Sequence, residues 1–280
     1  MEALIGLFSF ILGTVVGSFL NVVSLRHNTG RGLSGRSFCF TCGKTLSWYE
    51  LIPVFSFLFQ KGRCRACESA ISWQYPTVEV ITGILFFALS QKFLDFFMLG
   101  AIVGVGNFYG AMILSAMVIY AVLFGLLIAI GVYDLKHKII PNKLVYIFIL
   151  VAFIRVVGVS FINIFVLGDT LISVLPNLLS GPIVALPLFL IWFLSNGRAM
   201  GFGDVKLALG LGWMMSLWGA LAALMISFWV GGIVGIILLF LFSKKITMKT
   251  EVPFAPFLIS GTIIAFFFNI NIFSFLEFFG

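Results

Sequence analysis

Four carboxylic acids lie in or beside long apolar runs, where a charge is costly and therefore marks a candidate functional site. They are Glu79, Asp134, Asp204 and Glu251. Asp134 follows one apolar run, in GVYDLKHKIIPNKLV, and Asp204 precedes another, in GRAMGFGDVKLALG. Because Gly201 and Gly203 come just before Asp204, backbone or substrate can approach its carboxylate closely.

Two carboxylates held within a few ångströms of each other are able to hydrolyse a peptide bond. They do not both ionise easily, so they share one proton and titrate as a unit. The ionised member activates a water, and the protonated member donates to the carbonyl oxygen. We therefore predict that Asp134 and Asp204 are a catalytic pair, with the assignment of base and acid left open.

A second interpretation of these aspartates is that each is an ordinary solvated charge at the membrane surface. Lys136 and Lys138 follow Asp134, and Lys206 follows Asp204. In that case three neighbouring residues would also be ordinary loop charges: Lys136, Lys206 and His137. Beside a catalytic pair, they would instead adjust the pKa of the aspartates. The position of the residues alone leaves both interpretations open.

The four cysteines form two CxxC pairs, Cys39 with Cys42 and Cys64 with Cys67, separated by 21 residues. A thiolate pair at this spacing presents both sulfurs to one ion, and two such turns build a closed tetrahedral site typical of structural zinc. The small polar segment around them buries little core, so a metal would supply its folding free energy. Two disulfides or four unrelated thiols are the alternatives, and a cytoplasmic location disfavours the disulfides.

The elements that carry these residues are predicted to be membrane helices. Hydrophobic residues make up 61% of the 280 residues and charged residues only 10%, whereas soluble domains are nearer half and a quarter. The chain is therefore an all-α polytopic membrane protein. Its net charge of +7 lies in short stretches between apolar runs, as in cytoplasmic loops, so we expect no nucleic-acid partner.

A spanning helix needs ~20 apolar residues, and the sequence offers about eight candidates. They are Ala3–Leu25, Thr77–Phe97, Gly110–Tyr133, Leu144–Val166, Leu171–Leu194, Val205–Leu217, Trp218–Phe242 and Phe254–Phe278. The first lacks a basic region before it and is interpreted as a retained span rather than a signal peptide. We expect a tight helix junction near Ser216–Gly219. For Gly100–Gly110, the sequence also allows a re-entrant or loosely structured segment. The run LIPVFSFLF is too short to span, and is either interfacial or the core of the four-cysteine segment.

Basic residues set the orientation. Fifteen of the seventeen Lys and Arg fall in loops on one side, and only Lys92 and Arg155 fall toward the other. The positive-inside rule places those loops in the cytoplasm and both termini outside. The predicted organisation is a first transmembrane helix at 1–25, a zinc-ribbon-like cytoplasmic insert at 26–76, and a helical bundle with the aspartate pair at 77–280.

Six motifs in this order resemble the bacterial type IV prepilin peptidases, over nearly the whole chain. They are GSFLNVVSLR, the paired CxxC with WYELIPVFSFLFQKGRCRAC, YPTVEVITG, DLKHKIIPN with Asp134, GFGDVK with Asp204 in the GxGD form, and PFAPFL, where Ala255 replaces a common Gly. The resemblance implies an aspartic endopeptidase of the inner membrane that cuts the basic leader of prepilins or pseudopilins after a Gly, at the cytoplasmic face. Such enzymes serve pilus, type II secretion and competence systems.

The same resemblance implies N-methylation of the new N-terminus from S-adenosylmethionine. Glu79 and Gly83 match family positions associated with methyl transfer. An acid favoured by the helix macrodipole is the alternative explanation of Glu79, and the chain has no GxGxxG cofactor motif. The expected partners are the substrate helix and the lipid bilayer, with the oligomeric state open.

Two other classes of protein remain as rivals. A transporter or channel also uses membrane carboxylates and glycine-rich helix breaks, but predicts acids near the midplane and related halves. A membrane methyltransferase or scaffold with a zinc ribbon and no protease activity is the second. The identity of the pilin-like substrates is left open by the sequence.

Overall fold

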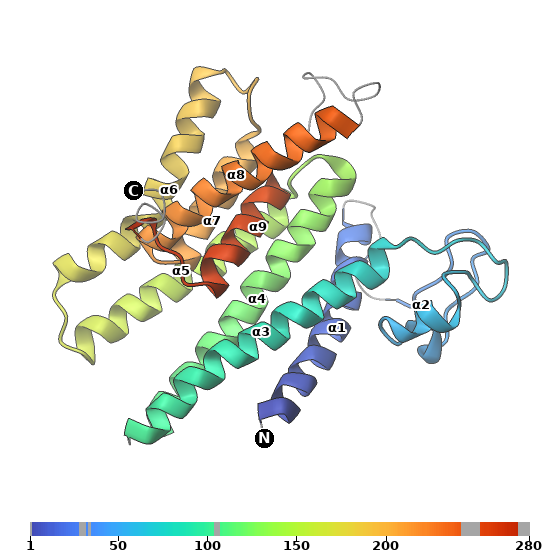
Figure 1. The fold of residues 1–280 in the computed structure, drawn as a ribbon, viewed down its shortest axis with the longest axis horizontal. Coiled ribbons are helices and arrows are strands. Elements are labelled where there is room, and N and C mark those ends of the chain that lie inside the picture. The colour runs from blue at the N-terminus through green and yellow to red at the C-terminus, as the bar shows by residue number, and fades with distance from the viewer. Residues whose placement is uncertain (1, 28–31, 33–34, 104–106, 242–252, 274–280) are drawn as a thin grey trace. The chain divides into compact units, whose positions relative to one another are not determined.

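The structure is a computed structural model that describes residues 2–27, 32, 35–103, 107–241 and 253–273. Its regular elements in this part of the chain are helices, together with two isolated β-bridges. The chain divides into two compact units, Met1–Val132 and Tyr133–Gly280 (Figure 1).

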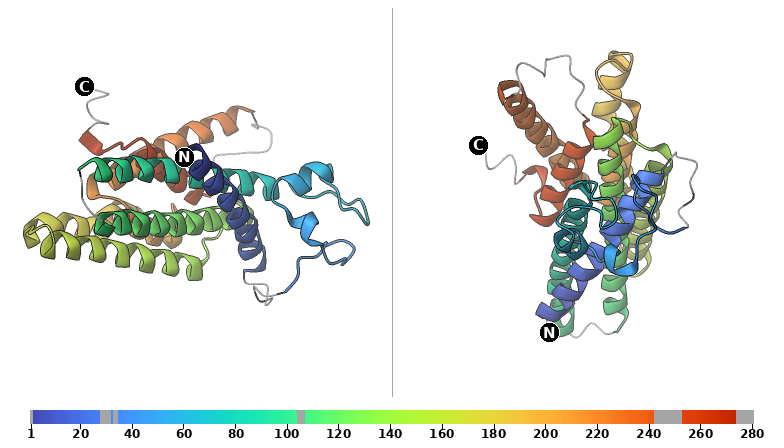
Figure 2. Two further views of the ribbon diagram at one scale, coloured as in Figure 1. Left: turned by 90° about the horizontal axis from the view of Figure 1, so that it is seen from below. Right: turned by 90° about the vertical axis from the view of Figure 1, so that its right-hand side faces the viewer.

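The first unit is built on two long helices that pack along each other, α1 (Glu2–Arg26) and α3 (Gln74–Val103) (Figures 1 and 2). Helix α4 (Asn107–His137) begins in this unit and ends in the second. Helices α3 and α4 extend into Gly100–Gly110, so the described residues of this segment are helical rather than re-entrant or loosely structured. Residues 104–106 lie outside the described residues.

The insert between α1 and α3 contains a short 3-10 helix η1 (Trp48–Leu51) and a single-turn helix α2 (Phe55–Phe59). Two antiparallel bridges, Phe38 with Thr45 and Arg63 with Ala70, close one turn around each CxxC pair. Within the apolar run LIPVFSFLF, Phe57 is buried, whereas most of the large side chains around it are exposed. These exposed side chains favour the interfacial interpretation over a core.

The second unit contains α5 (Asn142–Phe165), α6 (Leu171–Leu194), α7 (Phe202–Met214), α8 (Leu217–Leu241) and α9 (Ala255–Phe267). Helix α7 is central because it packs against α5, α6, α8 and α9. Most of its apolar side chains are buried, including Leu207, Ala208 and Met214. The helix that carries Asp204 is therefore held on several sides by its own unit.

Each of the eight predicted spans contains a helix, although the described residues are not helical at 215–216 of the sixth span or at 268–271 of the last. Within the described part of the chain, six helices are long and apolar enough to cross a membrane. These six are Glu2–Arg26, Gln74–Asp95, Gly110–His137, Asn142–Phe165, Leu171–Leu194 and Leu217–Leu241. Helices α7 and α9 have 13 residues each and reach only ~20 Å, less than the ~30 Å hydrocarbon core. The predicted junction is confirmed, since α7 ends at Met214 and α8 begins at Leu217. Glu251 and the last residues of the final predicted span lie outside the described residues.

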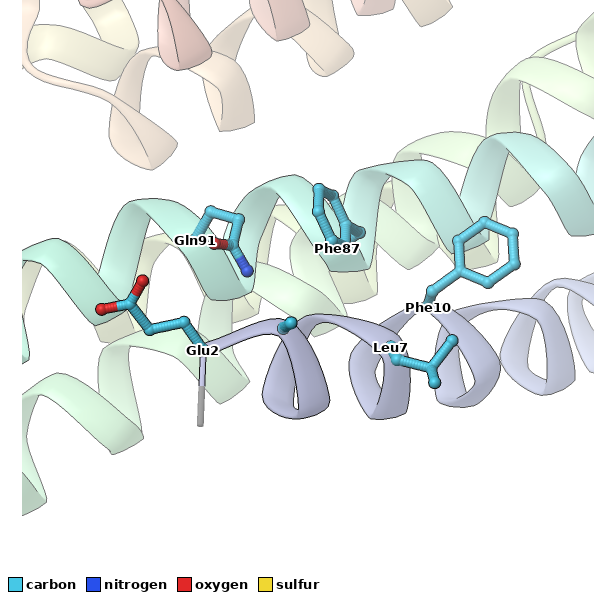
Figure 3. A pocket seen from close by; sticks show the side chains of 6 residues that line it. Glu2, Leu7, Phe10, Phe87 and Gln91 are labelled. Carbon is cyan, nitrogen blue, oxygen red and sulfur yellow. The ribbon is translucent and has the colours of Figure 1, made fainter.

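A shallow groove of about 550 Å³ runs between α1 and α3 (Figure 3). It is lined by Glu2, Ala3, Leu7, Phe10, Phe87 and Gln91. The walls are mostly apolar, as expected of a surface that lipid chains cover. The groove contains no member of the aspartate pair or the cysteine cluster, and therefore does not carry the predicted chemistry.

Candidate functional site: a pair of buried aspartates

Asp134 lies in the last turn of α4. Its backbone carbonyl accepts the N–H of Lys138 at 2.7 Å, and Lys138 has a positive φ of 54°, the left-handed conformation that commonly ends a helix. The side chain of Asp134 is only 3% exposed. The end of the helix therefore places this carboxylate inside the protein.

Asp204 lies in the first turn of α7. Gly201 is the N-cap of this helix and its carbonyl accepts the N–H of Asp204 at 3.2 Å. The side chain of Asp204 is 8% exposed. Because both aspartates are buried, the interpretation that each is a solvated surface charge is wrong.

The structure brings the two carboxylates together, close enough for the negative charge of Asp134 to repel that of Asp204. Among the described residues, Oδ2 of Asp134 and Oδ1 of Asp204 are buried and have no hydrogen-bond partner. Buried polar atoms almost always have a partner, and exceptions call for an explanation. Unpartnered acceptors on two carboxylates that repel each other are suited to a shared proton and to the polar groups of a substrate.

Asp134 has one backbone donor, which sequence reasoning missed. The N–H of Ala255 donates to its carboxylate, and Ala255, at the start of α9, is fully buried. The first N–H groups of a helix lack partners within it, so α9 offers this donor without loss. The sequence feature that could have predicted a free backbone donor here is the PFAPFL motif, because Pro256 indicates the start of a helix.

Gly203 lets the two aspartate segments approach each other. A Cβ at this position would lie 2.9 Å from Cβ of Ile140, in the loop that follows Asp134. This distance is shorter than real Cβ atoms show, so either α7 or the loop would have to move. The second glycine of GFGD is therefore a packing requirement between the two motifs.

We expect Gly203→Ala to lower kcat for the peptide hydrolysis predicted for the aspartate pair by about 10- to 100-fold, because an ~1 Å displacement of reacting groups has effects of that order. The matched control is Gly201→Ala, whose Cβ would lie at 3.7 Å from Oδ2 of Asp204, an ordinary contact. Rates of peptide cleavage by the purified protein in detergent would check this. Equal rates for the two alanine variants would contradict the packing role.

The neighbouring basic residues have other partners. Nζ of Lys206 donates to Oδ1 of Asn142 at 3.0 Å and to the hydroxyl of Tyr146 at 3.1 Å. These bonds join α7 to α5. The ring of His137 packs against that of Tyr133, with centroids 4.4 Å apart. For Lys206 these contacts favour a structural role over tuning of the aspartate pair.

The four cysteines meet at one point of the insert. Their ligand atoms all lie within 4.8 Å of one another, and Sγ of Cys39 is 3.8 Å from Sγ of Cys67. Tetrahedral zinc with sulfur ligands at ~2.3 Å separates its sulfurs by about 3.8 Å. The donor set and its spacing therefore fit one four-coordinate metal ion.

Hydrogen bonds to Cys39 and Cys67 favour the thiolate form of these two residues, the form that binds metal. The backbone N–H groups of Cys42 and Thr41 and the hydroxyl of Ser69 lower the pKa of Cys39 to about 6. The hydroxyl and backbone of Ser69 also lower the pKa of Cys67. The turns therefore favour the metal-binding form of the Cys39 and Cys67 sulfurs in the metal-free protein.

Glu79 and Gly83 lie on α3 in the first unit, and both are buried. The carboxylate of Glu79 accepts the N–H of Val54 at 2.7 Å. Gly83 packs against Phe10 and Thr14 of α1. Glu79 thus contacts the insert, whereas Gly83 contacts a membrane helix.

The helices define a multi-pass membrane protein, and two buried carboxylates that lie near each other are the groups that an aspartic endopeptidase uses. Residues 11–93 match the Bacterial Peptidase A24 N-terminal domain, and residues 121–236 match the Type IV leader peptidase family. The chain belongs to the type IV leader peptidase family.

Relatives of similar length support the assignment. A prepilin leader peptidase/N-methyltransferase of Bacillus subtilis is 31% identical over 272 residues, 95% of each chain. The protein of that name from Xanthomonas campestris is 31% identical over 299 residues, 96% of this chain and 93% of the relative. One from Vibrio cholerae is 29% identical over 231 residues, 75% and 77% of the two chains. No solved structure matches.

Proposed function

We propose that this protein removes the leader of prepilin-like substrates with Asp134 and Asp204 and then methylates the new N-terminus. The relatives are named for both activities, and family membership supports both in this chain. The observation that carries the peptidase assignment is the buried pair, in which each carboxylate keeps one oxygen without a partner among the described residues. Replacing either aspartate by asparagine tests it.

The hydrogen bond from Ala255 supports an assignment of roles. An N–H donor stabilises a carboxylate more than a carboxylic acid, so Asp134 is the ionised member and general base. It removes a proton from water, whose oxygen attacks the scissile carbonyl. Asp204 holds the shared proton and donates it to the carbonyl oxygen. Collapse of the gem-diol breaks the C–N bond: the proton on Asp134 passes to the leaving amine, and one hydroxyl of the diol returns its proton to Asp204, which leaves a carboxyl group and restores the pair.

The pattern of basic residues supports an active site at the cytoplasmic face of the inner membrane, with both termini outside. A substrate with a basic leader and an apolar helix fits this orientation. The helix enters laterally from the lipid, the leader stays in the cytoplasm, and the bond after the leader's last Gly reaches the aspartates. The family resemblance implies the substrate residues on either side of the cleaved bond: a Gly before it and, usually, a Phe after it.

For methylation, S-adenosylmethionine is the donor implied by the methyltransferase relatives. When bound, it supplies the methyl group to the free amine of the mature pilin. We assign Glu79 and Gly83 to this activity and Zn²⁺ to the four cysteines, as a structural ion in a closed site without an open position.

We expect Ala255→Pro to lower kcat/KM for leader removal by ~10- to 100-fold, since a hydrogen bond to a charged group contributes ~1.5–3 kcal/mol. Proline is tolerated at the first position of a helix and lacks only the N–H. Asp204 is the titratable group that faces Asp134. If Asp134 is the base, the acid limb of the pH profile moves to higher pH; if it is the acid, the basic limb moves instead.

The control for this variant is Ala255→Gly, which keeps the N–H and should remain within ~3-fold of wild type. Thermal unfolding of both variants in detergent would separate a local effect from misfolding, because Phe254 has a helical conformation that proline disfavours in the preceding residue. A proline variant with the wild-type rate and pH profile would overturn the role of Ala255.

A further inference from the structure

Glycines bring α1 and α3 into direct contact. A Cβ on Gly13 would lie 2.8 Å from Cα of Gly83, and one on Gly17 would lie 2.8 Å from Cα of Glu79. A Cβ on Gly83 would in turn lie 2.8 Å from Cγ2 of Thr14 and 2.9 Å from the ring of Phe10. Close approach of this kind is how small residues join membrane helices.

Gly83 is thus covered by α1 on the side where its side chain would be. Phe10 rises from α1 toward α3 in Figure 3, and Gly83 is buried. A small molecule bound at Gly83 on this side would have to displace that packing. Packing against α1 is by itself sufficient to explain why this position requires glycine.

Glu79 lies one helical turn before Gly83, where three segments of the chain meet. Its carboxylate accepts the N–H of Val54 from the insert at 2.7 Å and a hydrogen bond from Ser18 of α1. Glu79 is 6% exposed. Both of these contacts are to the protein itself, and both bind the insert or α1 to α3.

The bond to Val54 is made to a strained turn. Val54 has φ 62° and ψ −53°, and the N–H of Phe55 donates to the carbonyl of Pro53 at 2.6 Å, which defines a γ-turn. A positive φ is unfavourable for a β-branched residue, and such conformations persist only where the surroundings hold them. Glu79 holds this one, because it receives the N–H that the turn presents.

We propose that Glu79 and Gly83 are positioning residues for methyl transfer: they attach the four-cysteine insert to the α1–α3 pair and do not contact the methyl donor. Gly83 sets the distance between α1 and α3, and that distance places Glu79 against both Ser18 and Val54. The inference rests on the proposed assignment of these residues to methylation. Under this inference, Glu79 and Gly83 do not bind the methyl donor themselves, and instead they hold together the part of the protein that binds it.

The first test compares Glu79→Gln with Glu79→Ala, using a mature pilin, S-adenosylmethionine and mass spectrometry of the N-terminus. Glutamine keeps an acceptor for Val54 and Ser18, so we expect methylation within ~10-fold of wild type, because a neutral acceptor is weaker than a charged one. Alanine should lower it by ~50-fold or more. If glutamine is as inactive as alanine, Glu79 acts as a base and the inference is wrong.

Trypsin provides a readout of the attachment itself, since Lys61, Arg63 and Arg65 lie in the insert. Cleavage there should be faster in Glu79→Ala than in Glu79→Gln and wild type, and an unchanged rate in the alanine variant would also overturn the inference.

The second test is compensation at the helix contact. Gly83→Ala should lower methylation, and adding Thr14→Ser with Phe10→Ala removes the atoms that its Cβ would meet. We expect the combined variant to recover to within ~5-fold of wild type. Recovery is not expected if Gly83 itself touches the donor, so a combined variant as inactive as Gly83→Ala overturns the inference.

Leader removal by the same preparations reports that the rest of the protein is folded. The outcomes also separate this inference from the function on which it rests. Full methylation in Glu79→Ala would refute the assignment of Glu79 to methyl transfer altogether. Loss in alanine with rescue by glutamine supports both the assignment and the positioning role.

Discussion

Asparagine in place of either Asp134 or Asp204 is expected to lower kcat for leader removal by ~10³-fold or more, because positioned acid–base catalysis contributes up to about 10⁴-fold. Asparagine preserves the size of the side chain but neither accepts a proton from water nor donates one to the carbonyl oxygen. Because we propose that the two carboxylates act as a unit, we expect the loss in the double variant to be no larger than in a single one.

The measurement is the rate of appearance of mature pilin in detergent, with purified prepilin as substrate. Asp169→Asn is the matched control, since Asp169 is exposed and lies in the loop between α5 and α6. Methyl transfer to an already mature pilin should persist in the asparagine variants, which would show that they are folded. Leader removal at the wild-type rate by either variant would refute the catalytic pair.

The placement of the aspartates also distinguishes the rival functions. Asp134 lies at the end of α4 and Asp204 at the start of α7, rather than in the middle of a long helix. A transporter would require carboxylates near the bilayer midplane. Family membership agrees with hydrolysis.

The helices were predictable because lipid imposes a simple rule: long apolar runs become helices that satisfy their own backbone. The predicted Leu171–Leu194 is reproduced with the same bounds by α6. Asp134, Asp204 and the four cysteines were also predictable, because costly charges and paired thiols in an apolar chain stand out from their surroundings. In the structure the four cysteine sulfurs lie within 4.8 Å of one another and both aspartates are buried, while their functional roles stay predictions.

Contacts between distant segments were not predictable from local patterns. Nothing in the residue type of Ala255 indicates that its N–H reaches Asp134, since backbone donors are the same in every residue but proline. In the same way, the packing of Gly203 on Ile140 depends on the approach of two loops. These contacts require the tertiary structure, and they are the ones that refine the proposed mechanism.

Replacing Cys39 and Cys67 together by serine is expected to remove the bound metal and to lower methyl transfer by ~100-fold or more. Structural zinc contributes about 10–16 kcal/mol in small domains, and this insert has little else to hold it: its helices are η1 and α2, of four and five residues. Without the metal, the two CxxC turns have nothing that joins them strongly.

The measurement is metal content by elemental analysis of protein purified without a metal-affinity step, with one zinc per chain expected for the wild type. Thr41→Val is the control, since it keeps all four sulfurs and the backbone N–H that bonds Cys39. Wild-type protein without metal would contradict the zinc site.

The expected effect on leader removal is smaller, and the reason lies in the division of the chain. Asp134, Asp204, Ala255 and Ile140 all belong to the second unit, whereas the cysteines belong to the first. The contacts that position the aspartates, Ala255 with Asp134 and Ile140 with Gly203, involve no residue of the insert. The cysteine variant should therefore retain most of its peptidase rate while methylation is lost, which would assign the metal to the structure of the methylating part.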